Sequence, residues 1–129
     1  MEAKRTIILY NFSAERQKLI RTITAPLGCT VKSVDKRDFG QPVGAIAGVS
    51  GYVKDKNKKP LNGFDDEFMM ICGYEGMGLD VVLSVLRKGG VTRQTLKAAL
   101  TETNAAWSGE ELYGEVKKEH EAIKLKMEN

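Results

Sequence analysis

Four short apolar runs along the chain predict four β-strands. They lie at 6–12, 29–34, 68–74 and 95–101, and each is rich in β-branched, aromatic or other apolar residues. The more polar run at 29–34 is typical of an edge strand. The run at 68–74 is apolar without interruption, which favours a central strand covered on both faces.

Helical periodicity fills the intervals between most of these runs. Ser13 is a natural N-cap, because its hydroxyl can accept a hydrogen bond from a free backbone N–H, and apolar residues then recur at helical spacing. Residues 79–86 are apolar nearly all round, so we expect this second helix to be deeply packed. Ser108 and Glu111 form a capping box, in which each side chain accepts from the other's backbone N–H at the start of a last helix.

The last helix carries an apolar stripe that suggests an interaction surface. Its members recur at helical spacing and are Leu112, Val116, His120, Ile123 and Met127. Tyr113 lies beside this stripe. An exposed apolar stripe of this kind would support a homodimer through the C-terminal helix, or the docking of a protein partner.

The segment between the second and third apolar runs has the weakest pattern. Pro42 favours a short helix at 43–49, and residues 52–63 show no periodicity and predict an exposed, mobile loop. The loop holds the one basic patch, formed by Lys54, Lys56, Lys58 and Lys59. With Tyr52 it would contact a nucleic-acid backbone by charge and stacking, but Asp55 and the loop context favour a solvated segment, so nucleic-acid binding is not favoured.

The order of elements predicts a single α/β domain over 1–129. Alternation of strands and helices favours a three-layer parallel sheet of four strands in the order 2-1-3-4, numbered along the chain, with helices on both faces. The alternative is an α+β ferredoxin-like split βαβ arrangement, in which the second and third strands run antiparallel. Both place the first and third strands in the centre. The long crossover between the second and third strands favours the first arrangement.

Charge and cysteine content restrict the classes of partner and compartment. Twenty basic and seventeen acidic residues give a net charge of +3, a mild excess that permits a polyanion partner without arguing for one.

Cys29 and Cys72 lie in apolar runs without CxxC spacing and far from the lone His120, so we expect a reducing compartment, no metal site and no cofactor. No apolar run approaches membrane-spanning length, so the expectation is a cytoplasmic protein without a membrane partner.

A parallel sheet would gather polar side chains on one rim. Ligands of such sheets bind beyond the carboxyl ends of the strands, where the strand order reverses. The residues expected there are Asn11, Ser13, Tyr74, Glu75, Thr101, Thr103, Asn104 and Trp107. They would orient a small polar ligand, with Trp107 as an apolar wall. In the competing interpretation, residues 101–108 are a tight turn in which Asn104 bonds its own backbone and Trp107 packs beside the helix cap.

The remaining motifs carry weaker chemistry. Asp65, Asp66 and Glu67 precede a strand and so lie at the opposite edge from the expected site. The glycine-rich segment 73–78 lacks the spacing of a phosphate loop. We found no Ser-His-acid set, and Cys72 is expected to be a buried thiol. The favoured function is therefore that of a non-catalytic binding module. The alternative is an enzyme that acts on a small polar or phosphorylated substrate. A second alternative is weak nucleic-acid binding through the Lys54–Lys59 loop.

The C-terminal half resembles a known family. The block Lys-Ala-Ala-Leu-Thr-Glu-Thr-Asn at 97–104, the nearby Trp107 and the Lys-Glu-His at 118–120 resemble the bacterial domain-of-unknown-function family DUF3783. Residues 10–12 and 40–44 are similar to its longer members. The resemblance implies one intact domain, and it supplies no activity, cofactor or catalytic residue to transfer.

Overall fold

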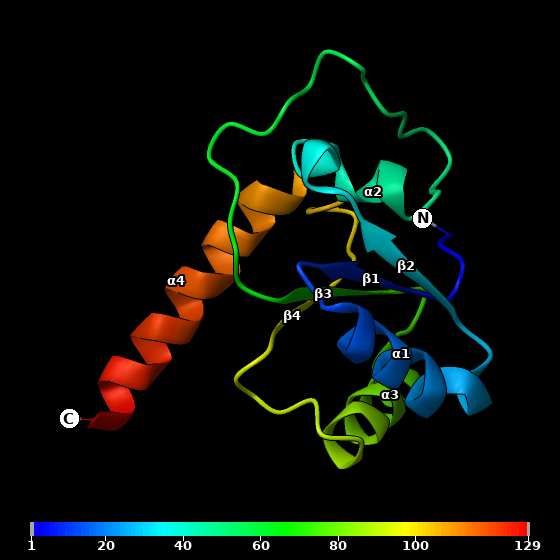
Figure 1. Cartoon of the computed structure of the whole chain (residues 1–129), viewed down its shortest axis with the longest axis vertical. Coiled ribbons are helices and arrows are strands. Elements are labelled where there is room, and N and C mark those ends of the chain that lie inside the picture. Colours follow the sequence, from blue (N-terminus) through cyan, green and yellow to red (C-terminus); the bar gives the residue numbers. More distant parts are fainter. Residues whose placement is uncertain (1, 129) are drawn as a thin grey trace.

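The computed structural model describes residues 2–128 and contains one four-stranded sheet (Figure 1). The strands are β1 (Thr6–Tyr10), β2 (Thr30–Val34), β3 (Phe68–Cys72) and β4 (Leu96–Ala99), each within an apolar run of the sequence. Their order is β2-β1-β3-β4, as predicted. β1 and β3 are buried at every position, whereas the residues of β2 are half-buried or exposed, as befits an edge strand.

Four helices accompany the sheet, and two short 3₁₀ turns follow α1 and β2. The helices are α1 (Ala14–Thr24), α2 (Val43–Ile46), α3 (Gly76–Lys88) and α4 (Gly109–Glu128). The 3₁₀ turns are η1 (Ala25–Leu27) and η2 (Lys36–Asp38). Helices cover both faces of the sheet, so the predicted α/β class is confirmed. Among residues 2–128, no helix combines the length and apolarity needed to cross a membrane.

The strand directions correct one part of the prediction. β1 pairs with β2 and β3 with β4 in parallel, but β1 and β3 are antiparallel, with Thr6 opposite Cys72 and Tyr10 opposite Phe68. An all-parallel sheet was therefore wrong at its central pair. β2 and β3 run in opposite directions, as in the ferredoxin-like alternative, although the strand order is that of the parallel arrangement. A strand buried on both faces has the same apolar pattern in either direction, so hydrophobicity does not set its polarity.

Alternate residues of the central strands build two separate cores. On one face, α1 and α3 lie side by side and enclose Ile7, Leu9, Ile20, Met69, Ile71, Val82 and Leu86. On the other face, α2, α4 and the connecting loops enclose Ile8, Tyr10, Phe39, Val43, Phe68, Met70, Leu96 and Leu112. This division follows from the period of two, by which successive side chains of a strand point to opposite faces.

Helix α3 is less deeply packed than its composition predicts. Only Val82 and Leu86 are buried in it, while Met77, Val81 and Leu83 are exposed. The sheet has only four short strands, and α3 shares one face of it with α1. Each helix therefore contacts the sheet along a single side and leaves its outer side in solvent.

Both predicted helix caps are confirmed. Ser13 Oγ accepts a hydrogen bond from Arg16 N at 3.2 Å at the start of α1. At the start of α4, Glu111 N donates to Ser108 Oγ at 3.1 Å and Ser108 N donates to Glu111 Oε1 at 3.2 Å. Such reciprocal bonds satisfy backbone donors that have no partner inside the helix.

The loop at 52–63 is largely exposed, as predicted, but a buried side chain ties it to the body. Gln41 Nε2 donates to the carbonyl oxygens of Asp55 at 2.6 Å and Lys58 at 3.1 Å, and Gln41 Oε1 accepts from Asp55 N at 2.8 Å. Gln41 itself is only 4% exposed. One side chain therefore fixes the base of the lysine-rich segment, which the lack of periodicity did not indicate.

The N-terminal part of α4 packs on the sheet, and the rest extends beyond it (Figure 1). Leu112 is buried, Val116 and His120 are half-buried, and Ile123 is 59% exposed. The side chain of Met127, the last member of the predicted stripe, lies outside the described residues. The predicted stripe thus begins in the core and ends on the surface.

Candidate functional site

The residues predicted to share one rim divide between two opposite edges of the sheet. β1 ends where β3 begins, because the two strands are antiparallel. Asn11 lies at that edge, and its Nδ2 donates to the carbonyl oxygens of Phe64 at 2.8 Å and Asp66 at 3.1 Å. Ser13 follows on the same edge as the cap of α1.

The other predicted residues follow the carboxyl ends of β3 and β4. Tyr74 and Glu75 come directly after β3, and Thr101, Thr103, Asn104 and Trp107 come after β4. Because β3 and β4 are parallel, their carboxyl ends share the edge opposite to Asn11. The expectation of one polar rim is corrected accordingly. Asn11 and Ser13 lie at one edge, and Tyr74, Glu75 and Thr101 follow the strand ends at the other. Trp107 lies two residues before Gly109, which contacts Tyr10 at the end of β1.

The Thr-x-Thr-Asn segment closes a turn on itself. Thr101 N donates to Asn104 Oδ1 at 2.9 Å, Asn104 N donates to Thr101 Oγ1 at 3.2 Å, and Asn104 Nδ2 donates to the carbonyl oxygen of Ala99 at 3.0 Å. Trp107 packs against the core that holds α4, and its carbonyl oxygen accepts from Val43 N at 2.8 Å. This geometry is that of the competing interpretation, in which the segment is a tight turn.

The structure also gives the surroundings of three further residues, Cys72, Tyr74 and Glu75. Burial raises the pKa of the Cys72 thiol to about 12, which keeps it protonated and unreactive near neutral pH. Tyr74 lies under Arg5, whose guanidinium carbon is 5.6 Å from the ring centroid. Glu75, just before α3, is exposed.

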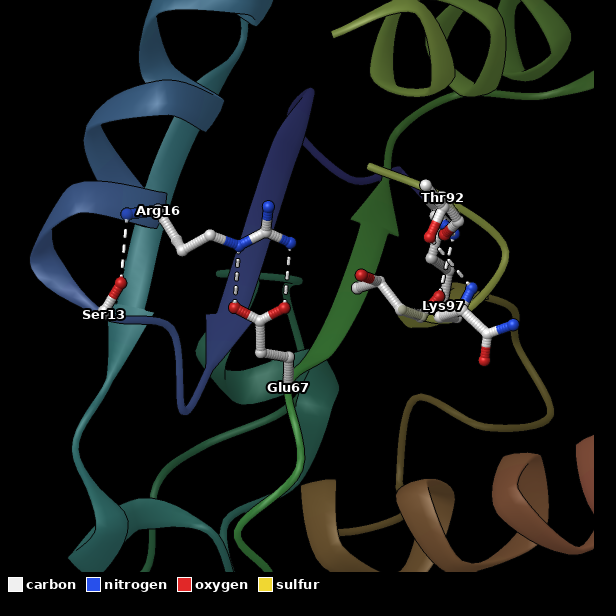
Figure 2. A network of polar contacts seen from close by, with 7 residues as sticks. Ser13, Arg16, Glu67, Thr92 and Lys97 are labelled. Carbon is white, nitrogen blue, oxygen red and sulfur yellow. Dashed lines mark hydrogen bonds and ion pairs between the residues drawn. The ribbon is translucent and has the colours of Figure 1, made fainter. Parts of the chain in front are cut away.

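A network of charged side chains joins α1, β3 and α4 at the edge where β1 ends. Arg16 binds Glu67 through two hydrogen bonds of 3.0 and 2.9 Å (Figure 2). Asp66 Oδ2 accepts from the Tyr113 hydroxyl and, at 3.1 Å, from Lys117 Nζ. The hydrogen bond from Tyr113, then that from Lys117, holds the pKa of Asp66 below its usual range.

The acidic cluster therefore ties separate elements together. Asp65 pairs with Lys36 at 3.0 Å, Asp66 with Lys117 on α4, and Glu67 with Arg16 on α1. The three carboxylates point to three different partners. The cluster thus connects the start of β3 to Lys36, α4 and α1. The three carboxylates do not converge on one point, as the ligands of a metal ion would.

Two adjacent hollows lie between α4 and the segment that leads into β4. They share Gln94, Leu96 and His120 in their linings. The smaller has a volume of about 220 Å³ and adds Asp66, Glu67, Lys117 and Glu121. The larger, here called the α4 groove, has a volume of about 700 Å³ and lies between residues 93–97 and the part of α4 from Val116 to Lys124.

The α4 groove combines apolar walls with an excess of positive charge. Leu96, Val116 and Ile123 supply the apolar surface. Three cations, Arg93, Lys97 and Lys124, line the groove together with one carboxylate, that of Glu119.

Lys97 occupies a special position in this groove. Its Nζ donates to the carbonyl oxygens of Thr92 and Thr95, both at 2.8 Å (Figure 2). Partial burial lowers the pKa of Lys97. A partly desolvated ammonium that faces carbonyl oxygens lacks the full charge compensation that a carboxylate would supply.

Sequence reasoning identified the two sides of the groove without bringing them together. It placed Leu96 and Lys97 on a strand and His120 and Ile123 on a helical stripe. Their contact depends on how α4 crosses the sheet, which local periodicity does not encode. One sequence signal could have indicated the groove. The apolar stripe of the last helix is longer than a sheet of four short strands can cover, so part of it had to remain exposed.

Comparison with known proteins agrees with the resemblance of the C-terminal half. Residues 67–123 match the model of the family described as "Domain of unknown function (DUF3783)". The matched segment contains β3, α3, β4 and most of α4, and so both sides of the α4 groove. No curated protein and no solved structure is found to be similar to the chain.

Proposed function

We propose that this domain is a non-catalytic protein-interaction module and that the α4 groove is its binding surface. The observation that carries the proposal is the groove itself. Its volume of about 700 Å³ lies within the range of ligand-binding clefts, and Leu96, Val116 and Ile123 line it. Apolar walls bordered by charged side chains are the usual composition of a protein-binding surface.

The extension of α4 supports the same assignment. Ile123 is 59% and Leu125 62% exposed in the C-terminal half of α4. An exposed apolar stretch that continues from a hollow favours association with another macromolecule. The helix thus offers more contact surface than the hollow alone.

The neighbouring hollow favours binding over acid–base catalysis. Its carboxylates Asp66 and Glu67 are held by Tyr113 and Lys117 and by Arg16, respectively. The pKa of Asp66 lies below its usual range, so this group stays ionised at neutral pH and is a poor general acid. The residues of the enzyme hypothesis, Asn11 and Glu75 among them, lie on opposite edges of the sheet.

A peptide selection tests the proposal and requires no known partner. Phage-displayed random peptides are selected on the whole chain, and binding of the enriched peptides is measured by isothermal titration calorimetry. Ile123→Glu, which places a carboxylate in the groove, is expected to weaken binding at least about 10-fold. Val81→Glu is the matched control, because Val81 is also exposed, at 52%, but lies on α3 and does not line the groove, and this variant should bind as the parent does.

The proposal fails if selection enriches no peptide, or if the enriched peptides bind the Ile123→Glu variant as tightly as the parent chain. Both variants lie at exposed positions, so circular dichroism should show unchanged folding. A homodimer through α4 stays a prediction of the sequence and is checked by light scattering on the same samples.

A further inference from the structure

We infer that the α4 groove takes an acidic segment in extended conformation, added as a fifth strand beside β4. This inference rests on the proposed function and specifies the class of partner. The segment would carry apolar side chains alternating with carboxylates. Three observations support it: the open edge of β4, the charge of the groove, and the apolar surface beside that edge.

The first observation is that β4 lies at the edge of the sheet and, within residues 2–128, pairs with β3 alone. Leu100 N donates to Ile71 O, and the bonds of a parallel ladder alternate along the strand. Ala98 therefore faces β3, and the backbone groups of Lys97 and Ala99 face outward. The carbonyl oxygen of Ala99 accepts from Asn104 Nδ2, which leaves the N–H and C=O of Lys97 and the N–H of Ala99 for an added strand.

The second observation is the uncompensated charge. The groove lining contains three cations and one carboxylate. In the part of the chain that the structure describes, the ion pairs involve neither Arg93 nor Lys97 nor Lys124. The ammonium of Lys97 contacts two carbonyl oxygens. A carboxylate from a partner would supply the missing counter-charge, and complementary potentials of this kind favour and orient association.

The third observation is the apolar surface next to the open edge. Val116 and Ile123 on α4 and Leu96 on β4 line the same hollow. A strand presents alternate side chains to opposite sides, so one set of a partner's side chains would face these apolar groups and the other set the solvent and cations. Backbone pairing combined with pockets for alternate side chains is the known principle of strand addition.

Backbone conformation distinguishes an extended segment from a second copy of α4. Residues Gly109–Glu128 are helical, and the N–H and C=O groups inside a helix bond to each other. The helix of another copy could therefore not pair with the outward-facing backbone groups of β4. An extended acidic segment would make those bonds and also supply counter-charge, and for this reason we favour it over self-association through α4.

The inference is tested with two synthetic peptides that differ only in charge. One alternates Glu and Val over about eight residues, and the other replaces every Glu by Lys. Each is titrated into the ¹⁵N-labelled whole chain at low salt and again at high salt. The Glu–Val peptide is expected to shift the amide signals of Lys97 and Ala99 and those of α4 near Ile123, and to bind more weakly at high salt.

Two charge reversals complete the test. The double variant Arg93→Glu with Lys124→Glu should bind the Glu–Val peptide at least about 10-fold more weakly. Lys126→Glu is the control, because Lys126 lies on α4 outside the groove and its reversal changes the net charge of the same helix. It should weaken binding about 2-fold or less.

The outcomes separate this inference from the proposed function. Equal binding of the Lys–Val peptide overturns the acidic class of partner. An absence of amide shifts at β4 overturns the added strand. If the peptides enriched by selection lose affinity for Ile123→Glu but are basic, the groove remains a binding surface and the acidic class is wrong. A dimer in light scattering that Ile123→Glu dissociates identifies a second copy as the occupant and likewise overturns the inference.

Discussion

Gly109, the first residue of α4, lies directly against the ring of Tyr10, the last residue of β1. A Cβ on Gly109 would stand 2.6 Å from Tyr10 Cε1 and 2.7 Å from its hydroxyl oxygen. The absence of a side chain therefore lets the helix begin on top of the strand end. This contact brings the start of α4 close to the end of β1.

Substitution of Gly109 by alanine is expected to destabilise the fold. The added methyl group would overlap the buried ring, and overpacking of this kind costs about 1–3 kcal/mol. Gly114→Ala is the control in the same helix, because a Cβ there meets nothing within 4 Å and alanine favours the helix by about 0.5–1 kcal/mol. Urea unfolding should show opposite signs for the two variants; equal effects would mean that the ring moves freely aside.

Removal of the Tyr10 hydroxyl is expected to stabilise the protein. The ring is fully buried, its oxygen finds no hydrogen-bond partner among the described residues, and burial raises the pKa of the group. Tyr10→Phe deletes an unsatisfied polar atom and should raise the free energy of unfolding by about 1 kcal/mol. A loss of similar size in urea unfolding would show that the hydroxyl has a partner in solution.

Glu110 is expected to hold the loop in front of α4. Its carboxylate accepts hydrogen bonds from the backbone N–H groups of Leu61 at 2.6 Å, Asn62 at 3.1 Å and Gly63 at 2.7 Å. In Glu110→Ala, hydrogen exchange of these three amides should become at least about 10-fold faster. Glu115→Ala is the control, because Glu115 pairs with Lys118 inside α4, at 3.5 Å, and not with the loop among the described residues. Unchanged exchange in Glu110→Ala would show that the loop holds its shape without this carboxylate.

The same contact should depend on pH. Partial burial raises the pKa of Glu110, but the three backbone donors outweigh it, so the pKa lies below the usual value of 4.5. A lowered carboxyl pKa stabilises the folded state above the unfolded pKa, and this contribution is lost as the pH falls through the folded pKa. The stability difference between the parent and Glu110→Ala, followed by urea unfolding, should therefore shrink below about pH 4.5. A difference that stays constant down to pH 2 would contradict the assignment.

Asp66 should contribute to stability in a second acid-sensitive window. Its lowered pKa means that the bonds to Tyr113 and Lys117 favour the ionised form, so their stabilisation is present above the ordinary Asp pKa of about 3.9 and disappears at lower pH. Because the side chain is about half exposed, water screens the interaction, and Asp66→Asn should cost only about 0.5 kcal/mol at pH 7. Asp65→Asn, which removes a fully exposed pair with Lys36, should cost less. Equal losses for the two variants in urea unfolding would contradict the role of Tyr113.

Much of the local structure followed from short sequence patterns. The caps at Ser13 and at Ser108 with Glu111 depend on residues three positions apart, so a local pattern was sufficient to find them. The four strands were found because apolar runs bounded by turn residues are long enough to recognise. The polarity of β3 was not found, because its burial on both faces is independent of its direction.

The functional surface was harder to predict because it depends on distant pairs. Asn104 was correctly considered as a turn residue, since its bonds reach only to Ala99 and Thr101. Gln41 and Glu110, by contrast, bind backbone groups 14 to 49 residues away. No local pattern marks a glutamine or glutamate for such a role, so both were missed, as was the approach of α4 to Leu96.

The antiparallel junction between β1 and β3 determines what the segment matching the family would expose if it stood alone. Residues 67–123 include β3 and β4 but not β1, so β3 would keep its bonds to β4 and present an open edge on the other side. An apolar strand with such an edge readily pairs with another chain. Two identical segments related by a twofold axis perpendicular to the sheet would join β3 to β3 in antiparallel fashion. They would thereby reproduce, as a symmetric dimer, the four-stranded sheet that this chain builds from two different halves.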